Sequence, residues 1–207
     1  MDHTDQEIFW KGEFGNEYIE RNKSEYLLAA NLHFFARITQ NIGKIESIFE
    51  FGCNAGMNLK ALSFLMPDTQ LAAVEINERA ASQARKIENV TKVHNDSIQE
   101  LQLQDKYDFV FSKGVLIHLN PDQLPKAYQK LANSSNRYVM IAEYFNPAPV
   151  MLSYRGNDDK LYKRDFAAEF IGQNQEFKLI DYGFCYKNVS NYSQDDITWF
   201  LMERKNA

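Results

Sequence analysis

The 207-residue sequence has few cysteines, no basic cluster and no long apolar run. Its two cysteines, Cys53 and Cys185, suit a reducing compartment and are too few for a disulfide framework or a cysteine-based zinc site. No block of Lys or Arg is long enough to follow a phosphate backbone, and the net charge is -5, so a nucleic acid is not an expected partner. No apolar run reaches membrane-spanning length, and the first seven residues lack the basic and apolar regions of a secretory signal. These absences predict a cytoplasmic protein that binds neither a membrane nor a metal ion.

Glycine is also sparse, and two of the nine glycines frame the most informative segment, residues 47–59. There an apolar, strand-like run ends at Gly52, a tight turn leads to Gly56, and a helical pattern follows. In a parallel sheet such a loop lies at the carboxyl end of a strand, where glycines let the backbone approach a ligand. Glu50 would repel a phosphate, and Asn54 stands where a pyrophosphate-binding GxGxxG loop has its second glycine. The segment therefore favours a ligand without a pyrophosphate.

This loop resembles the first motif of class I S-adenosylmethionine-dependent methyltransferases, (D/E)xGxGxG. Glu50, Gly52 and Gly56 match the motif, and Asn54 replaces its middle glycine. Asn is the non-glycine residue that best tolerates a left-handed backbone, so the loop can keep its shape. The resemblance implies S-adenosyl-L-methionine as cofactor, with these four residues around its methionine part.

Glu75 is the candidate for binding the ribose. It lies about 20 positions after the glycine loop, near the end of the apolar run 71–76, where an acidic residue typically holds the two ribose hydroxyls. Its neighbour Ile76 belongs to the same expected cofactor site.

Asp96 is the candidate for binding adenine. It ends the third strand-like run, 90–97, and the methyltransferase resemblance implies that its carboxylate accepts a hydrogen bond from the adenine amine, with Ser97 beside it. Asp105 and Asp108 are competing choices for this role. Asp96 could instead cap a following helix, because Asp is a preferred N-cap residue.

The reactive end of the ligand should lie beyond the fourth and fifth strands. The fourth run, 107–114, ends beside the glycine loop if the sheet is doubly wound, so Lys113 is expected in the cofactor site. His118 follows as a candidate general base for an acceptor hydroxyl, since an imidazole titrates near neutral pH. A packed, hydrogen-bonded histidine is the alternative. Glu143, near the end of the fifth run 137–144, is the second candidate base.

Aromatic residues are concentrated before the first strand, in the segment 8–22, which is expected to form a lid or flap. Trp10, Phe14 and Tyr18 are spaced four apart and share one helical face, which either packs on the domain or contacts the ligand. Tyr18 is therefore included in the expected acceptor site. Arg21 could pair with the carboxylate of a zwitterionic cofactor, although a solvated arginine is the alternative.

Residues 144–165 are predicted to form a substrate loop, because prolines stiffen its start and polar, turn-forming residues follow. Tyr144, Tyr154 and Arg155 are the expected acceptor contacts in this loop. Arg155, Lys163 and Arg164 would suit an anionic acceptor, and solvated surface charge is the alternative.

The predicted fold is a single α/β domain over residues 1–207. Residues 1–43 are expected to form an N-terminal helical lid, and residues 44–207 a Rossmann-like, doubly wound core. That core is a mostly parallel seven-stranded sheet with helices on both faces. The last two strand-like runs, 179–186 and 197–202, have no helix between them, so an antiparallel hairpin should close the sheet.

Segments outside the cofactor motifs are similar to the pseudaminic acid biosynthesis-associated methylases. They are residues 9–22, 144–147, 153–156, 163–167 and 194–201. That resemblance implies a bacterial pathway for a nine-carbon acidic sugar. The hypothesis is methyl transfer to an oxygen or nitrogen of a small, anionic, sugar-like acceptor.

Two other functions remain open at this stage. One is a methyltransferase-like module that binds without catalysis. The other is a nicotinamide-dependent oxidoreductase, against which the missing glycines and the closing hairpin argue. The sequence leaves the acceptor atom and the oligomeric state undecided.

Overall fold

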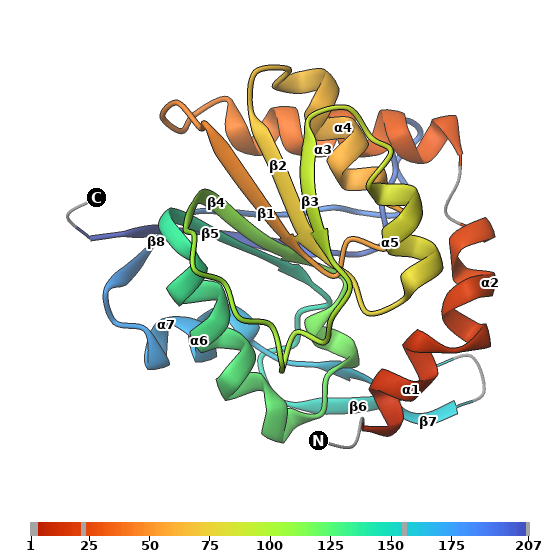
Figure 1. Cartoon of the computed structure of the whole chain (residues 1–207). Coiled ribbons are helices and arrows are strands. Elements are labelled where there is room, and N and C mark those ends of the chain that lie inside the picture. Colours follow the sequence, from red (N-terminus) through yellow and green to blue (C-terminus); the bar gives the residue numbers. More distant parts are fainter. Residues whose placement is uncertain (1–3, 22–23, 155–156, 206–207) are drawn as a thin grey trace.

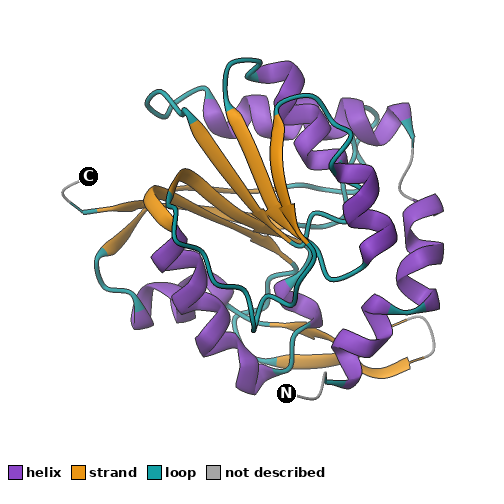
Figure 2. Cartoon of the chain, viewed as in Figure 1, coloured by secondary structure: helices purple, strands orange, loops and turns teal. Residues whose placement is uncertain are grey.

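The computed structural model describes residues 4–21, 24–154 and 157–205. Its centre is a seven-stranded sheet in the order β3-β2-β1-β4-β5-β9-β8 (Figures 1 and 2). The strands are β1 (Ser47–Phe51), β2 (Gln70–Val74), β3 (Val90–His94), β4 (Tyr107–Lys113), β5 (Ser135–Glu143), β8 (Phe177–Phe184) and β9 (Thr198–Arg204). The first five strands pair in parallel, and β9 is antiparallel to both β5 and β8. The predicted sheet and its closing hairpin are confirmed.

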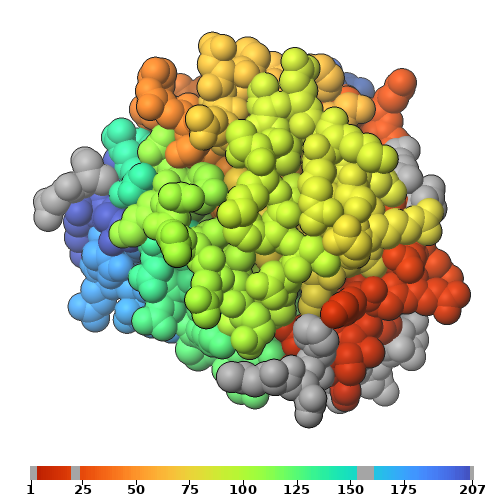
Figure 3. Space-filling view, in the orientation of Figure 1, coloured from red at the N-terminus to blue at the C-terminus, as the bar shows by residue number. Residues whose placement is uncertain are grey.

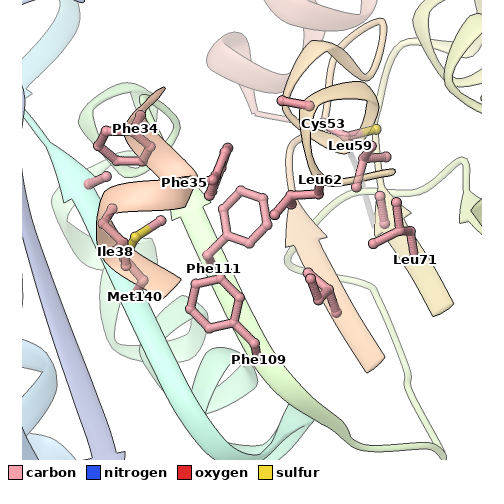
Figure 4. Close-up of a cluster of buried hydrophobic side chains, with 14 of the residues drawn as sticks. Phe34, Phe35, Ile38, Cys53, Leu59, Leu62, Leu71, Phe109, Phe111 and Met140 are labelled. Atoms are coloured by element: carbon pink, nitrogen blue, oxygen red, sulfur yellow. The ribbon is translucent and has the colours of Figure 1, made fainter. Parts of the chain in front are cut away.

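Helices cover both faces of this sheet because its strands are apolar on both sides. One buried cluster joins α3 (Glu25–Thr39), α4 (Met57–Leu65) and α5 (Glu78–Ala84) to the sheet through Phe109 and Phe111 (Figure 4). The other joins α6 (Leu124–Ser134) and α7 (Phe166–Gln173) to the opposite face through Val110. Successive side chains of β4 point to opposite faces of the sheet, so this strand contributes to both clusters.

The N-terminal helices α1 (Asp5–Lys11) and α2 (Glu13–Arg21) stand apart from these layers, near the carboxyl ends of the parallel strands (Figure 1). In the space-filling view they lie against the segment that contains α5 (Figure 3). The expected lid over residues 1–43 therefore corresponds to α1 and α2 only. Helix α3 belongs to the core, since Phe34, Phe35 and Ile38 are buried against the sheet.

The segment 144–165, predicted to be a substrate loop, contains regular secondary structure over much of its length. Strands β6 (Val150–Tyr154) and β7 (Asn157–Lys163) form an antiparallel hairpin there, separate from the main sheet. Two short 3-10 helices, η1 (Leu116–His118) and η2 (Pro121–Gln123), complete the described elements. No helix in the described ranges is long and apolar enough to cross a membrane.

Candidate functional site

A cavity of about 690 Å³ opens at the carboxyl ends of the parallel strands. It spans the place where the strand order reverses between β1 and β4, which is where doubly wound sheets bind ligands. The loops after β1, β2, β3 and β4 and the start of the chain after β5 form its floor. Residues of α1, α2, the start of α3 and the segment 187–197 form the remaining walls.

The glycine loop lies on this cavity in left-handed backbone conformations. Gly52, Asn54 and Gly56 have φ values of 75°, 47° and 81°, so Asn54 adopts the conformation expected of it. The N–H groups of Gly52 and Cys53 donate to the carbonyl of Val74, at distances of 2.9 and 3.2 Å, and fix the loop to the end of β2.

The two glycines of this loop lie close to different neighbours. A Cβ on Gly52 would come within 2.6 Å of Val115 Cγ2, and Gly52 lines the cavity. A Cβ on Gly56 would come within 2.4 Å of Ile87 Cδ1, and Gly56 is not among the cavity-lining residues. The missing Cβ at Gly56 lets the start of α4 lie close to Ile87 and Ala84, and the role of Gly56 beside a ligand stays a prediction.

Glu75 joins the glycine loop to the next strand tip. Its Oε2 accepts from Asn54 N and its Oε1 from Asn77 N, each at 2.8 Å. Burial raises the pKa of Glu75, and the backbone donors oppose that shift. Both Glu75 and Ile76 line the cavity, so a polar ligand there meets a preoriented carboxylate.

Asp96 and Ser97 line the cavity after β3. Asp96 is exposed, and its Oδ1 accepts from Ser97 N at 2.8 Å. The hydroxyl of Ser97 is hydrogen-bonded to Glu7 of α1. Of the competing aspartates, Asp108 instead accepts from two backbone N–H groups before β1, at 2.9 and 3.1 Å, away from the cavity. Asp105 does not line the cavity either.

Glu50 lies beneath the cavity rather than in its wall. It is fully buried, its Oε1 accepts from Asn58 Nδ2 at 2.6 Å, and its Oε2 has no hydrogen-bond partner. Burial raises the pKa of Glu50 to about 8. Asn58, which lines the cavity, therefore stands between Glu50 and any ligand.

Of the two candidate bases, only His118 lines the cavity. It is buried in η1, with its ring 4.7 Å from the ring of Trp10. Glu143 is 2% exposed and its Oε1 accepts from Ser112 Oγ at 2.9 Å and from the N–H groups of Val115 and Leu116. The structure thus does not place Glu143 where an acceptor could reach it.

Tyr18 and Tyr144 both line the cavity. Tyr144 Oη donates to Asp195 Oδ2 at 3.0 Å, and Lys163 Nζ lies 5.3 Å from the centre of the Tyr144 ring. The side chain of Arg164 is instead paired with Glu169 at 2.7 Å, on the side of α7. Of the other predicted contacts, Arg155 and the side chains of Arg21 and Tyr154 lie outside the described residues.

Residues 48–136, from β1 to the start of β5, match the family model described as a methyltransferase domain. Over these residues the chain is similar to a methyltransferase domain. Its fold resembles solved methyltransferases over nearly the whole chain.

Magnesium protoporphyrin IX methyltransferase from Synechocystis, solved with bound S-adenosylmethionine, superposes with a TM-score of 0.68 at 12% identity. The superposition covers 99% of this chain and 100% of that one. The sugar N-methyltransferase KedS8 from Streptoalloteichus gives a TM-score of 0.66 at 15% identity, with 100% and 96% of the two chains covered. At these identities the likeness is one of fold.

A curated relative also matches part of the chain. The malonyl-[acyl-carrier protein] O-methyltransferase from Bacillus cytotoxicus is 31% identical over 107 residues, which are 48% of this chain and 37% of the relative. The match thus covers little more than a third of that protein's length.

The residues around this cavity fit the S-adenosylmethionine of the solved methyltransferase. A carboxylate stands at each of two successive strand tips, β2 and β3, and the left-handed glycine loop leaves the cavity open between β1 and β4. The described residues include no cluster of three or more His, Cys, Asp or Glu side chains suited to a metal ion.

The cavity also has residues that the sequence did not indicate. They are Asn31, Asn58, Asn77, Gln194 and Asp195. Most are neutral side chains brought in by tertiary packing. For Gln194 and Asp195 a signal existed, because they begin one of the segments similar to the pseudaminic acid-associated methylases.

Proposed function

We propose that this domain transfers the methyl group of S-adenosyl-L-methionine to an oxygen or nitrogen of a small, anionic, sugar-like acceptor. The observation that carries the proposal is one continuous cavity, running from Glu75 and Asp96 at the β2 and β3 tips to His118 and Tyr144 beyond β4 and β5. Its volume, about 690 Å³, lies well within the range of small-ligand sites. A cofactor and a small acceptor can thus share it.

Within this proposal, the strand tips order the ligand along the edge of the sheet. Glu75 would hold the ribose hydroxyls and Asp96 the adenine amine, while the glycine loop faces the methionine part. The cofactor supplies an activated methyl group on a sulfonium. The chain's own contribution is chiefly positioning, which can account for much of the acceleration of an in-line displacement.

The acceptor end would then be the wall made of His118, Tyr144 and Asp195. His118 is the proposed base that takes a proton from an acceptor hydroxyl, and Tyr144 with Asp195 would orient the reacting group. Lys187, which also lines the cavity, and Lys163 beside the Tyr144 ring favour an acceptor with negative charge.

Three sequence segments support a nonulosonic acid of the pseudaminic type as that acceptor. The segments 9–22, 144–147 and 194–201 are far apart in the sequence, yet Trp10, Tyr18, Tyr144 and Asp195 all line the same cavity. Those segments are similar to the pseudaminic acid-associated methylases. The match to KedS8, a sugar methyltransferase, concerns the fold alone and adds no acceptor.

A transfer assay tests this proposal. The chain is incubated with S-adenosylmethionine and, in parallel, with a nonulosonic acid, a neutral hexose or malonyl-acyl carrier protein, and each acceptor is analysed by mass spectrometry. We expect methylation of the nonulosonic acid, abolished or strongly reduced by His118→Ala. If only the carrier-protein substrate is methylated, the proposed sugar-like acceptor is wrong, while the proposed methyltransferase activity stands.

A further inference from the structure

Lys113, the last residue of β4, brings an ammonium group to the cavity without a matching carboxylate. Its Nζ lies 3.4 Å from Asn31 Oδ1 and 5.5 Å from the centre of the Phe34 ring. Across the described parts of the chain, no carboxylate oxygen lies within 4.0 Å of this nitrogen. The other lysine of the cavity wall, Lys187, is exposed and lies 3.6 Å from Asp196.

The acidic groups nearest to Lys113 are engaged elsewhere. They are Glu50, Glu143 and Asp195, together with the thiol of Cys185. Glu50 accepts from Asn58, and Asp195 accepts from Tyr144. Burial raises the pKa of Glu50 to about 8 and that of Glu143 to about 7, which disfavours the charged form of both carboxyl groups.

A half-buried ammonium that lacks an anion is costly, and a ligand anion in the cavity would remove that cost. Burial lowers the pKa of Lys113, which is the electrostatic sign of the same imbalance. Asn31 holds the ammonium from one side, because its Oδ1 accepts from both Lys113 and Gln194 Nε2, the latter at 2.9 Å. Lys113 and Asn31 both line the cavity, so a ligand bound there lies next to this pair.

We propose that Lys113 binds the α-carboxylate of the cofactor's methionine part and that Asn31 positions its ammonium for this contact. The inference rests on the proposed function. If the adenosine lies at the β2 and β3 tips, the methionine part falls beside β1 and β4, where Lys113 ends β4. The α-carboxylate is the only anionic group of S-adenosylmethionine at neutral pH. The sequence suggested Arg21 for this carboxylate, and the Arg21 side chain lies outside the described residues; the proposal gives the role to Lys113.

This contact is tested by removing the carboxylate from the ligand and the ammonium group from the side chain, separately and in combination. S-adenosylmethionine and decarboxylated S-adenosylmethionine differ only in the carboxylate, and their dissociation constants are measured by calorimetry for the wild type and Lys113→Met. We expect the wild type to bind the decarboxylated ligand about 10- to 100-fold more weakly, as for a lost charge-assisted hydrogen bond. Lys113→Met should lose a similar factor for S-adenosylmethionine and less than about twofold for the decarboxylated ligand.

Two further variants separate binding from folding. Lys113→Arg keeps the charge and should retain most of the preference for the carboxylate. Lys178→Met removes a charge at the far end of β8, where Lys178 pairs with Glu203 at 3.5 Å, and should behave as wild type.

Each remaining outcome counts against the inference. Equal binding of the two ligands by the wild type overturns it without any variant, even if Lys113→Met does not fold. Equal weakening of both ligands by Lys113→Met assigns Lys113 a structural role instead. Failure of the folded wild type to bind either ligand overturns the proposed function itself, and this inference with it.

Discussion

Left-handed backbone and close packing together determine which positions of the glycine loop tolerate a side chain. Asn54 has a φ of 47° and still carries a side chain, whose Oδ1 accepts from Ala55 N at 2.7 Å. Gly56 has a φ of 81°, and its missing Cβ leaves room for Ile87 and Ala84. The conformation alone therefore does not require glycine throughout the loop. At Gly56 the close packing of Ile87 and Ala84 is a second reason for glycine.

Gly56→Ala should therefore destabilise the fold more than Gly114→Ala. Both glycines have positive φ values, 81° and 68°, but a Cβ at Gly114 would meet nothing within 4 Å. We expect a loss of about 1 kcal/mol in the free energy of unfolding for Gly114→Ala, from backbone strain alone. Gly56→Ala should lose about 1–3 kcal/mol more, from overpacking against Ile87. Urea unfolding of the two variants measures the difference, and equal losses would contradict the packing argument.

At the residue scale, the sequence indicated the positions of the carboxylates that line the cavity better than those of the carboxylates beneath it. Glu75 and Asp96 could be located because they stand at the ends of apolar runs, and both line the cavity. Glu50 and Glu143 also stand near strand ends, but they are turned under the cavity floor. Spacing along a strand gives the tip, while the face that a side chain takes depends on packing.

At the level of elements, one side chain joins the N-terminal helices to the cofactor-side loops. Asn77 Nδ2 donates to the carbonyls of Trp10 and Lys11, both at 3.3 Å, and to Asn16 Oδ1 at 3.0 Å. The oxygen of the same amide caps α5, since Oδ1 accepts from Ala80 N at 3.0 Å. Asn77 therefore couples α1 and α2 to the strand tip that carries Glu75.

Asn77→Asp should loosen α1 and α2 and leave α5 in place. The aspartate keeps an oxygen that can cap α5, but it has no N–H to donate to the N-terminal helices. We expect faster hydrogen–deuterium exchange in residues 5–21 and unchanged exchange in α5. Asn77→Ala, which removes the cap as well, should affect both regions. Unchanged exchange in residues 5–21 of both variants would contradict the coupling.

The hairpin β6–β7 marks the limit of sequence reasoning about elements. Its second strand has the sequence Asn-Asp-Asp-Lys-Leu-Tyr-Lys, whose first half is rich in residues that disfavour strands. Its first strand follows two prolines, and Val150, Met151 and Leu152 are all exposed rather than alternating. The apolar residues of the first strand thus lack the alternation of buried and exposed positions that would give a periodic signal in the sequence.

For the whole molecule, the order of apolar runs predicted the sheet almost completely. Five runs separated by helical or turn segments imply parallel crossovers, and two runs without a helix between them imply the antiparallel end. The path of the chain outside the sheet was less predictable. That α1, α2 and the segment 187–197 meet over one cavity follows from tertiary packing, which no local pattern encodes.

The central claim is that this cavity binds S-adenosylmethionine through the β2 and β3 tips, and calorimetric titration with S-adenosylhomocysteine tests it most directly. We expect binding of S-adenosylhomocysteine and none of NADH. Glu75→Ala should weaken binding by about 1–3 kcal/mol, for a lost hydrogen bond to a charged group. The control is Glu78→Ala, three residues after Glu75. It removes an exposed carboxylate paired with Arg85 and should bind as wild type. A folded wild type that binds NADH or no nucleoside ligand at all would contradict the account.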